Sequence, residues 1–498
     1  MTKPPLQAQA EAALAFLEAM AEDRTRLVGI DDETRHRLMH AAGEFLFPDA
    51  QAKRATAKAF RKRDKQRVKD ADERVLSSTG IRTLRSAPVF VTPGPGPILP
   101  PPVEAEEERE LFEERKCYVC KVRYRTAHSF YDQMCGECGD FNFAKRSQTA
   151  DLRGRTVLIT GARVKIGYQA SMLLLRAGAR VIVTTRFPKD AALRYAREPD
   201  YAGFRDRLSI HGLDLRHTPS VEAFCAHRLE TERRLGHVIH NACQTVRRPA
   251  GFYAHLLEAE RQSAEALPAD VRGTLAAPDM VEGASLSVAG SAPLAVGLTH
   301  AAELSQLALL DEDHLRGGAI FPEGSLDADL QQRDLRRVNS WRLTLAEVPT
   351  VELLEVQLVN AIAPFVMNAR LKPLMLRTPE RDKHIVNVSA MEGQFYRTYK
   401  TDRHPHTNMA KAALNMMTRT SAHDYVKDGI HMNSVDTGWV TDEDPAHLAE
   451  RKTVETGFHP PLDIVDGAAR IVDPIFHGAN TGEHFYGLFL KDYKPVPW

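Results

Sequence analysis

Residues 156–167 join a β-branched run to a turn that carries two glycines, Thr-Val-Leu-Ile-Thr-Gly-Ala-Arg-Val-Lys-Ile-Gly. An apolar helical stretch over residues 168–177 follows, Gly178 ends it, and a second β-branched run covers residues 181–185. Gly161 permits a sharp exit from the strand, and Gly167 lets the next helix pack close to the sheet. This order predicts the first unit of a parallel sheet, because alternation of strands and helices is typical of such sheets.

The same alternation continues to the end of the chain. Further short strands are expected at residues 208–210, 237–240 and 384–388, with helical stretches between them. Residues 151–498 are therefore predicted to form an α/β domain of the Rossmann type, with a doubly wound parallel sheet.

A long insertion, residues 246–345, interrupts this pattern where a loop of ~2–6 residues is usual. It contains an apolar stretch at residues 301–310, for which we expect a helix. The insertion leaves the carboxyl ends of the strands, where ligands bind in such sheets. It is expected to be either a lid that shapes the substrate site or a dimerisation element.

The glycine turn is a candidate phosphate site, since the unpaired N–H groups of the following helix face any phosphate placed there. Arg186 ends the second strand. A carboxylate at that point would accept the ribose hydroxyls of NAD, whereas a guanidinium suits the 2′-phosphate of NADP. Arg163 and Lys165 add two cations in the turn. We therefore expect NADP(H) in preference to NAD(H); the alternative is that Arg186 only caps the sheet edge.

Four of the six cysteines form two pairs, Cys117-x-x-Cys120 and Cys135-x-x-Cys138. Each pair can hold one cation from a tight turn, so the spacing predicts a structural zinc site closed by four protein ligands. His128, between the pairs, is expected at the surface. A redox dithiol is less favoured, because neither pair begins a helix within a strand–helix–strand unit. Paired metal-binding cysteines indicate a reducing compartment, and we expect the cytoplasm.

The segments before the sheet have different compositions. Residues 1–87 are predicted to be helical, and residues 88–115 form a proline-rich linker whose acidic run, 104–114, is expected to be a solvated helix. Residues 116–150 are the zinc module. A run rich in Lys and Arg over residues 53–74 is interpreted as a solvated helix face, since acidic residues interrupt it. The chain has 66 basic and 66 acidic residues, which does not favour nucleic acid.

Six motifs, in order over residues 151–498, resemble those of the short-chain dehydrogenase/reductase family. They are the turn with Thr160, Gly161, Ile166 and Gly167, then Asp214-Leu215, Asn241-Ala242, Asn360, Lys411 and Thr437-Gly438. The resemblance implies that Asp214 contacts the adenine of a nicotinamide cofactor and that the Thr437-Gly438 segment lies over the nicotinamide. It also implies a small-molecule substrate and a homo-oligomer.

The family's mechanism, as the resemblance implies it, uses an asparagine, a serine, a tyrosine and a lysine. Asn360 and Lys411 match two of these positions. Thr407 stands where the family has tyrosine, and an aliphatic hydroxyl is a poor proton donor at neutral pH. Ala390 stands where the family has its catalytic serine, with Ser389 one residue earlier.

A replacement proton donor is expected on the loop before the Lys411 helix. Tyr399 and His406 are the first candidates there, because a phenol or an imidazole can transfer a proton at a carbonyl. The chain is therefore predicted to be an NADP(H)-dependent oxidoreductase with a non-standard active site. A nicotinamide-nucleotide-binding regulator or scaffold without catalysis is the alternative, and a zinc-dependent nucleic-acid binder is a third. No run of ~18 apolar residues predicts a membrane span.

Overall fold

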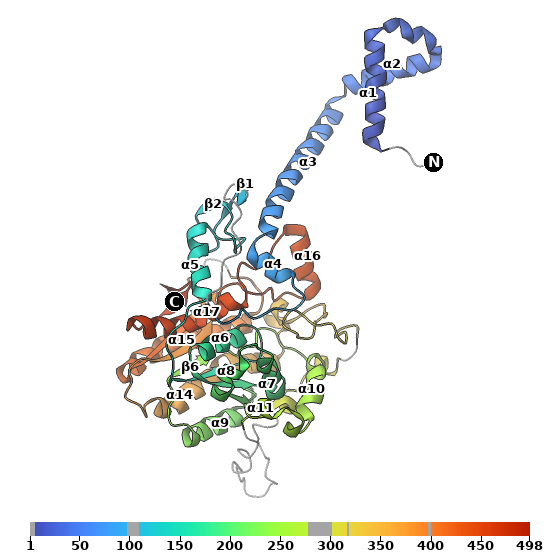
Figure 1. Ribbon diagram of the computed structural model, residues 1–498. Helices are drawn as coiled ribbons and strands as arrows, with labels where there is room; N and C mark the ends of the chain where they lie inside the picture. Colours follow the sequence, from blue (N-terminus) through green and yellow to red (C-terminus); the bar gives the residue numbers. More distant parts are fainter. Residues whose placement is uncertain (1–4, 97–108, 277–300, 316–317, 397–399) are drawn as a thin grey trace. The chain divides into compact units, whose positions relative to one another are not determined.

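A computed structural model describes residues 5–96, 109–276, 301–315, 318–396 and 400–498 (Figure 1). They divide into two units, residues 1–73 and residues 74–498. The first unit consists of α1 (Leu6–Glu22), a 3₁₀ turn (Arg24–Gly29), α2 (Asp32–Leu46) and most of α3 (Ala50–Ser77). Asp31 caps α2, because its carboxylate accepts a hydrogen bond from the N–H of Thr34 at 2.8 Å. No side chain of α1 or α2 is buried, so local interactions hold these helices.

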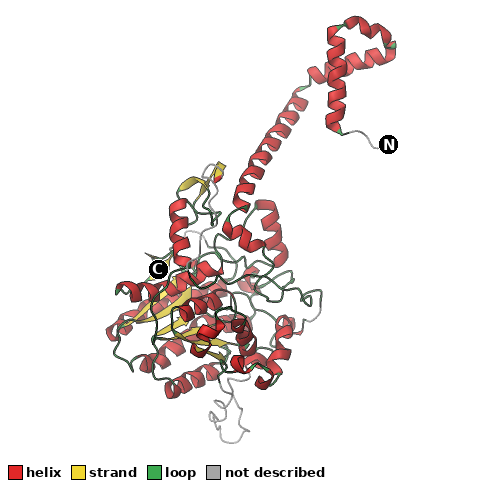
Figure 2. Ribbon diagram, viewed as in Figure 1, coloured by secondary structure: helices red, strands yellow, loops and turns green. Residues whose placement is uncertain are grey.

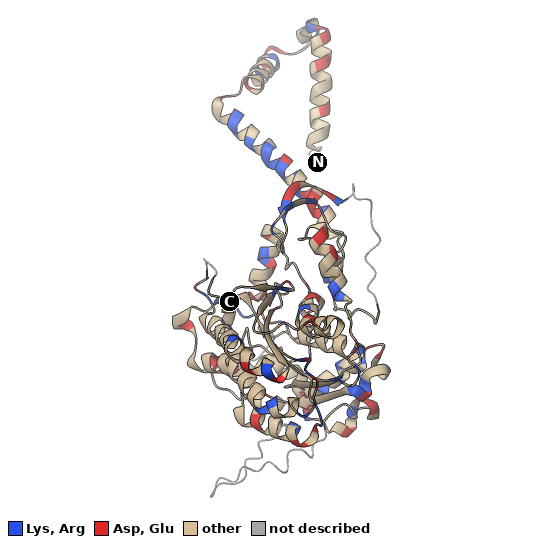
Figure 3. Ribbon diagram, turned by 90° about the vertical axis from the view of Figure 1, so that its left-hand side faces the viewer, with Lys and Arg blue, Asp and Glu red and all other residues tan. Residues whose placement is uncertain are grey.

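Helix α3 carries Lys and Arg along much of its length, with Asp and Glu toward its C-terminal end (Figure 3). Arg63 pairs with the adjacent Asp64, and the amide of Gln66 donates to the carboxylate of Asp70. These contacts are exposed and join near neighbours on the helix.

One eight-stranded sheet organises the second unit. Its strands are β3 (Thr156–Thr160), β4 (Arg180–Thr185), β5 (Leu208–Gly212), β6 (His237–His240), β7 (Lys383–Ser389), β8 (Ile430–Asp436), β9 (Phe489–Lys491) and β10 (Lys494–Val496). Their order is β5-β4-β3-β6-β7-β8-β9-β10, parallel throughout except for β9–β10. From β5 to β8 this is the order expected of a Rossmann sheet, which confirms the predicted fold class.

Helices cover both faces of the sheet (Figure 2). One face packs against α6 (Lys165–Arg176), α7 (Pro188–Ala196) and α17 (Ile464–Thr481), and the other against α9 (Thr218–Thr231), α14 (Ala363–Met375) and α15 (Pro405–Tyr425). Alternate residues of β3 supply the two cores: Val157 and Ile159 enter the first, and Leu158 enters the second.

The second unit has further helices of 4 to 11 residues. They are α4 (Gly80–Ser86), α5 (Gly136–Arg146), α8 (Tyr201–Phe204), α10 (Ala254–Arg261), α11 (Ala269–Arg272), α12 (Ala301–Leu304), α13 (Thr350–Gln357) and α16 (Ala446–Thr456). The helix expected at residues 301–310 is thus limited to the single turn α12. Residues 277–300 and 316–317 of the insertion lie outside the described residues.

The prediction of a helix for the acidic run before the cysteines is wrong over the residues that the structure describes. Residues Glu110–Lys116 form strand β1, paired with β2 (Arg123–Thr126) in an antiparallel hairpin. Leu111 is buried against Leu76 and Ala127, and Glu114 lies within ion-pair distance of Arg123 across the hairpin. Burial of that leucine and cross-strand charge pairing outweigh the helix propensity of glutamate. Residues 104–108 are outside the described part.

The continuous helix over residues Thr350–Met375 is long and apolar enough, by length and composition, to cross a membrane. Half of its most apolar window is buried inside the protein. Met367, Leu371 and Leu374 of this helix belong to the core beneath the sheet. The segment is therefore packed as a core helix of the Rossmann domain.

Histidines line the amino-terminal end of the sheet. His237, His384 and His431 are register neighbours on β6, β7 and β8, and Nε2 of His384 lies 3.1 Å from Nδ1 of His484. Burial, with the positive charges and imidazoles nearby, lowers the pKa of His237 to about 3 and that of His384 well below its usual value. These imidazoles are therefore neutral in the folded protein at neutral pH.

This histidine cluster should make the second unit sensitive to mild acid. Unfolded histidines take up protons near pH ~6.5, whereas in the folded protein the pKa of His237 is about 3 and that of His384 is well below its usual value, so stability falls as pH drops below ~6.5. Denaturant melts at pH 7.5 and 5.0 should show the loss. His237→Asn keeps an acceptor for the N–H of His384 and should flatten the pH dependence, whereas the exposed His447→Asn should leave it unchanged. Parallel pH curves for wild type and His237→Asn would contradict this account.

Candidate cofactor and active site

A cavity of about 700 Å³ lies at the carboxyl ends of β3, β4 and β6. The glycine turn, the residues after β4 and β6, residues 327–339 of the insertion and the segment 441–449 line it. The strand order changes direction between β3 and β6, and crevices at such a point bind ligands in α/β sheets. The site predicted at the glycine turn is thus a real cavity of the protein.

The glycine turn leaves no room for side chains at its two glycines. Gly161 has φ = 69°, and a Cβ there would lie 2.7 Å from Cα of Ala242. A Cβ at Gly167 would collide with the side chain of Asn241, whose amide donates to the carbonyls of Thr160 and Gly161. Asn241, directly after β6, therefore binds the glycine turn at the base of the cavity.

Lys165 opens α6 in a left-handed conformation, with φ = 56°. Such a φ is costly for a residue with a Cβ, and this is the turn position where the resembled family has glycine. The ammonium group makes no hydrogen bond or ion pair within the described residues, and Lys165 lines the cavity. A strained cation at the start of a helix is placed to meet an anionic ligand.

Arg186 lies at the carboxyl end of β4 and lines the cavity. Its guanidinium donates to the hydroxyl of Tyr253 at 2.6 Å and lies 4.6 Å from the centre of that ring. Within the described residues it has no carboxylate partner at ion-pair distance. Burial opposes ionisation of Tyr253, but Arg186 and Arg248 together lower the pKa of this phenol. This corner of the cavity is therefore electropositive.

Two other residues expected to bind the cofactor are already engaged by the protein. Arg163 donates to the carboxylate of Asp190 at 2.7 Å and to the side-chain oxygen of Gln331 at 3.2 Å. Both carboxylate oxygens of Asp214 accept from Arg216, at 3.0 and 2.7 Å. Arg163 and Asp214 still line the cavity, but each would meet a ligand as half of an ion pair.

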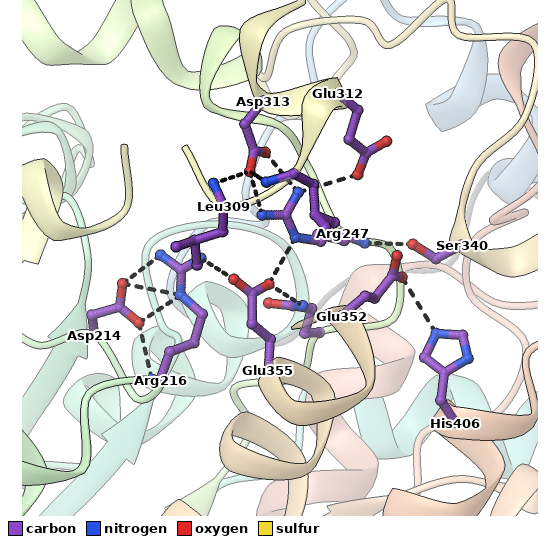
Figure 4. A network of polar contacts seen from close by, with 12 residues as sticks. Asp214, Arg216, Arg247, Leu309, Glu312, Asp313, Ser340, Glu352, Glu355 and His406 are labelled. Carbon is purple, nitrogen blue, oxygen red and sulfur yellow. Dashed lines mark hydrogen bonds and ion pairs between the residues drawn. The ribbon is translucent and has the colours of Figure 1, made fainter. Parts of the chain in front are cut away.

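An ion-pair network extends from Asp214 into the insertion (Figure 4). Arg216 binds Glu355 of α13 at 3.0 Å, and the other oxygen of Glu355 accepts from Arg247 at 2.9 Å. Arg247 in turn makes two hydrogen bonds, of 2.6 and 2.7 Å, to Asp313. This buried network fixes the start and middle of the insertion to the helix that carries Asn360.

The insertion contacts both sides of the cavity. Phe252, Tyr253 and Phe321 pack on Phe187, which follows Arg186. At the other side, the amide of Asn339 donates to the carbonyl of Glu443 at 2.9 Å. The described part of the insertion therefore lines the cavity and contacts the chain on two sides of it, and its role as a lid stays a prediction.

Asn360 lies in a π-helical turn, Leu358–Ile362, between α13 and α14. Its side-chain oxygen accepts from the N–H of Gln244 at 2.8 Å, and its amide donates to the carbonyl of the same residue at 3.2 Å. π turns often mark functional positions because they redirect one side chain. Here the turn binds Asn360 to the loop after β6.

The catalytic positions implied by the resemblance lie near one another, but the side chains of Lys411 and Ser389 make hydrogen bonds to other residues of the protein. Lys411 of α15 donates to the carbonyl of Val388 at 2.7 Å, and the hydroxyl of Ser389 donates to Asn415 at 2.6 Å. Both side chains are buried. The hydroxyl of Thr407 is also buried and has no hydrogen-bond partner. Ser389 thus points toward α15.

His406 is buried, and its Nε2 lies 3.3 Å from Glu352 of α13. That distance suits an ion pair, but its geometry is not that of a hydrogen bond, so neither ring nitrogen has a hydrogen-bond partner. His406 does not belong to the residues that line the 700 Å³ cavity. Tyr399, the other candidate, lies outside the described residues, so its position stays a prediction.

Asp436 ends β8 beside Ser389, its register partner on β7, and sequence reasoning gave it no role. Burial raises the pKa of its carboxyl to about 6, with Lys491 opposing and Glu392 adding to the shift. Asp436 precedes Thr437 and Gly438, the pair predicted to lie over the nicotinamide. Nothing local in the sequence marks Asp436, because its environment is built from separate strands.

Two of the remaining predicted cofactor residues bind each other: the N–H of Ala242 donates to the hydroxyl of Thr160 at 3.0 Å. Leu215 is buried in the core on the α9 face and also lines the cavity. Ile166 lines the cavity and packs against the core of the cysteine module. Thr437 and Gly438 follow β8 without lining the cavity, and Gly438 has φ = 76°.

The four cysteines come together. The sulfurs of Cys117, Cys120, Cys135 and Cys138 all lie within 4.8 Å of one another, and those of Cys120 and Cys135 are 3.7 Å apart. Sulfurs bound at ~2.3 Å to a tetrahedral zinc ion would be separated by ~3.8 Å, so the cluster can hold such an ion. His128 is buried rather than exposed, since its Nδ1 accepts the N–H groups of Phe130 and Tyr131.

Comparisons with known proteins agree with this architecture. A family model described as Enoyl-(Acyl carrier protein) reductase matches residues 340–459. Uncharacterized protein R665 of Acanthamoeba polyphaga mimivirus is 30% identical over 381 residues, which cover 73% of this chain and 71% of that protein. Human retinol dehydrogenase 14 is 38% identical over 118 residues, 20% of this chain and 35% of the human protein.

A solved structure of NADPH-bound carbonyl reductase from chicken fatty liver matches 70% of this chain and all of that one. The TM-score is 0.42 and the sequence identity 18%.

The sheet order, the glycine turn and the cavity at the strand ends define an α/β protein of the Rossmann type. The relatives narrow this class further. The chain belongs to the short-chain dehydrogenase/reductase family of oxidoreductases, and it carries a four-cysteine module before its sheet.

Proposed function

We propose that the protein is an NADP(H)-dependent oxidoreductase that acts on a small molecule. The observation that carries the proposal is Arg186, which lines the cavity at the end of β4 without a carboxylate partner in the described residues. The 2′-phosphate of NADP(H) fits that guanidinium, and the pyrophosphate fits the start of α6 beside Lys165. When bound, the cofactor supplies or accepts a hydride.

The chain's own residues would then hold the reacting groups and manage a proton. Lys411 binds the carbonyl of Val388 near the end of β7, Asn360 binds the loop after β6, and the insertion would limit the access of water. We propose His406 as the source of the proton, because its ring nitrogens have no hydrogen-bond partner and Nε2 lies 3.3 Å from Glu352. Since His406 does not line the cavity, its proton would reach a substrate there through an intervening hydroxyl or water. The unpartnered hydroxyl of Thr407 lies one residue away.

We further propose that the cysteine cluster holds Zn²⁺ as a structural ion. Four thiolate ligands close the coordination shell, so the metal would stabilise the module and leave no open position for a substrate. Without an ion, burial raises the pKa of Cys135 and Cys138, whereas at Cys117 burial is outweighed by backbone N–H groups of both cysteine turns, the knuckles Cys117–Cys120 and Cys135–Cys138, which lower its pKa to about 7. Such N–H donors are typical of zinc knuckles.

A regulator without catalysis is the second candidate, and a specific observation favours it. Ser389 bonds to Asn415, Lys411 bonds to Val388, and neither lines the cavity. A protein that only senses the nicotinamide nucleotide would need the cavity and not these groups.

Turnover separates the two candidates. NADPH oxidation should be measured with a panel of carbonyl, imine and quinone acceptors. We expect turnover with at least one acceptor, and a fall in kcat of about 10²–10⁴-fold for His406→Asn with the Kd for NADP⁺ unchanged, since that is the usual contribution of proton transfer. The exposed His447→Asn is the matched control. Tight binding with no turnover on any acceptor would favour the regulator.

A further inference from the structure

The cysteine module shares its core with the wall of the cofactor cavity. Phe130, Tyr131 and Met134 of the module pack with Val440, Leu462 and Ile464, and Ile166 of the glycine turn packs against the same cluster. Ile166 and Ile464 also line the cavity. The module therefore forms the far side of two cavity-wall segments, the glycine turn and the chain after β8.

Tyr118 makes the most direct contact between the two parts. It lies inside the first knuckle, between Cys117 and Cys120, and its hydroxyl accepts the N–H of Trp439 at 3.0 Å. Gly438 adopts φ = 76°, and a Cβ at that residue would lie 3.2 Å from the Tyr118 oxygen. The phenol thus fits closely against a backbone turn that is also bound by the N–H of Leu462, which donates to the carbonyl of Trp439 at 3.3 Å.

The knuckle in turn holds Tyr118. The N–H of Tyr118 donates to the carbonyl of Gln133 at 2.8 Å, and the N–H of Cys117 donates to the carbonyl of Val122 at 2.9 Å. The ammonium of Lys491, at the end of β9, lies 5.5 Å from the centre of the Tyr118 ring. With both knuckles bound to one ion, the position of this ring would be fixed relative to the sheet.

The segment that Tyr118 holds leads directly into the cavity. Thr441 to Asp444 follow Trp439 and Val440, and they line the cavity opposite the insertion. The amide of Asn339 from the insertion binds the carbonyl of Glu443. A shift of the turn at Gly438 would therefore move one wall of the cavity, together with Glu443, to which the insertion is bound through Asn339.

We propose that the four-cysteine module holds one wall of the cofactor site in place, and that Tyr118 is a positioning residue for the turn 437–440. The metal orders the knuckle, the knuckle holds the phenol, and the phenol fixes the cavity wall. This inference rests on the proposed function, because it gives the module a role in binding a nicotinamide nucleotide.

The test compares Tyr118→Phe with Tyr124→Phe in the full-length, zinc-loaded protein. Tyr124 is a second tyrosine of the module, but its hydroxyl donates to the carbonyl of Asp132 within the module. We expect Tyr118→Phe to weaken NADP⁺ binding about fivefold to tenfold, the effect of one lost hydrogen bond. Amide exchange at Trp439 should accelerate, while exchange at Leu158 in the central strand stays slow. Tyr124→Phe should leave both readouts unchanged.

Metal removal from the wild type gives an independent measurement. Zinc released by a chelator is titrated with a chromophoric indicator, and we expect the fluorescence of Trp439 and its amide exchange to change in proportion to the zinc lost. Unchanged NADP⁺ affinity and unchanged exchange at Trp439, in both Tyr118→Phe and the metal-free protein, would overturn the inference. Absence of NADP⁺ binding by the wild type would instead defeat the proposed function, and the exchange measurement would still test the role of Tyr118.

Discussion

Replacing Arg186 by aspartate is expected to invert the cofactor preference. The wild type should bind NADP⁺ more tightly than NAD⁺, because the guanidinium at the end of β4 is available to a 2′-phosphate. Loss of that cation and the introduction of a like charge should weaken NADP⁺ binding by on the order of 100-fold or more. The new carboxylate can accept the ribose hydroxyls of NAD⁺, so NAD⁺ should bind as well as before or better.

Calorimetric titration of both nucleotides into both proteins measures this inversion. Arg197→Asp is the matched control, since Arg197 is exposed at the end of α7 and does not line the cavity. It introduces the same charge change eleven residues away. Equal losses of NADP⁺ affinity in Arg186→Asp and Arg197→Asp would show that net charge, rather than contact with the phosphate, sets the preference.

The substitution Arg146→Met should strongly destabilise the second unit. Arg146 is fully buried in α5 and binds Asp463 through two hydrogen bonds of 2.7 and 2.9 Å and lies 3.0 Å from Asp466. Its removal leaves two buried carboxylates without a cation, which typically costs about 3–5 kcal/mol. Urea unfolding followed by fluorescence measures the loss. The exposed pair Arg153–Asp151 is the control, and Arg153→Met should have no measurable effect.

The cost of Arg146→Met should also depend on pH. In the wild type, burial opposes ionisation of Asp463, but Arg146 holds the pKa of this carboxyl below its usual range. Without the guanidinium that pKa rises above the unfolded value, so the penalty is full at high pH and is relieved as pH falls through the raised pKa. The stability deficit should therefore be smaller at pH 5 than at pH 8. A deficit that does not change with pH would mean that lost packing dominates.

Local patterns predict the sheet well. The strand β6 was expected at residues 237–240 and lies at His237–His240. It could be predicted because a short β-branched run between two helical stretches is visible in consecutive residues. The strands β8, β9 and β10 were not predicted. Three residues carry no usable period in β9 and β10, and near β8 (Ile430–Asp436) only the motif that follows it, Thr437-Gly438, was recognised. The run of glutamates before the cysteines was misjudged because its strand depends on a partner hairpin strand and on burial of Leu111.

The same division holds for the site. The glycine turn and Arg186 could be found because the strand, turn and helix are contiguous in the chain. The bonding of Asp214 to Arg216 was not foreseen, nor was the link from Glu355 to Arg247, which joins residues 108 positions apart. Tyr118 gives no signal either, because its partner Trp439 is 321 positions away. Sequence reasoning therefore located the cavity but not the contacts that shape it.

The docking of the cysteine module imposes an order on biosynthesis. Tyr131 bonds to Asp466 and Arg146 to Asp463, partners that are 335 and 317 positions later in the chain. At ~5–20 residues per second, roughly 15–60 s of translation separate the emergence of the knuckles from that of these partners. During this interval the contacts to the last helix are not yet available, and a bound ion would help to hold the two cysteine pairs together. Metal binding would thus come before completion of the sheet, and the metal site would form before α17 is synthesised.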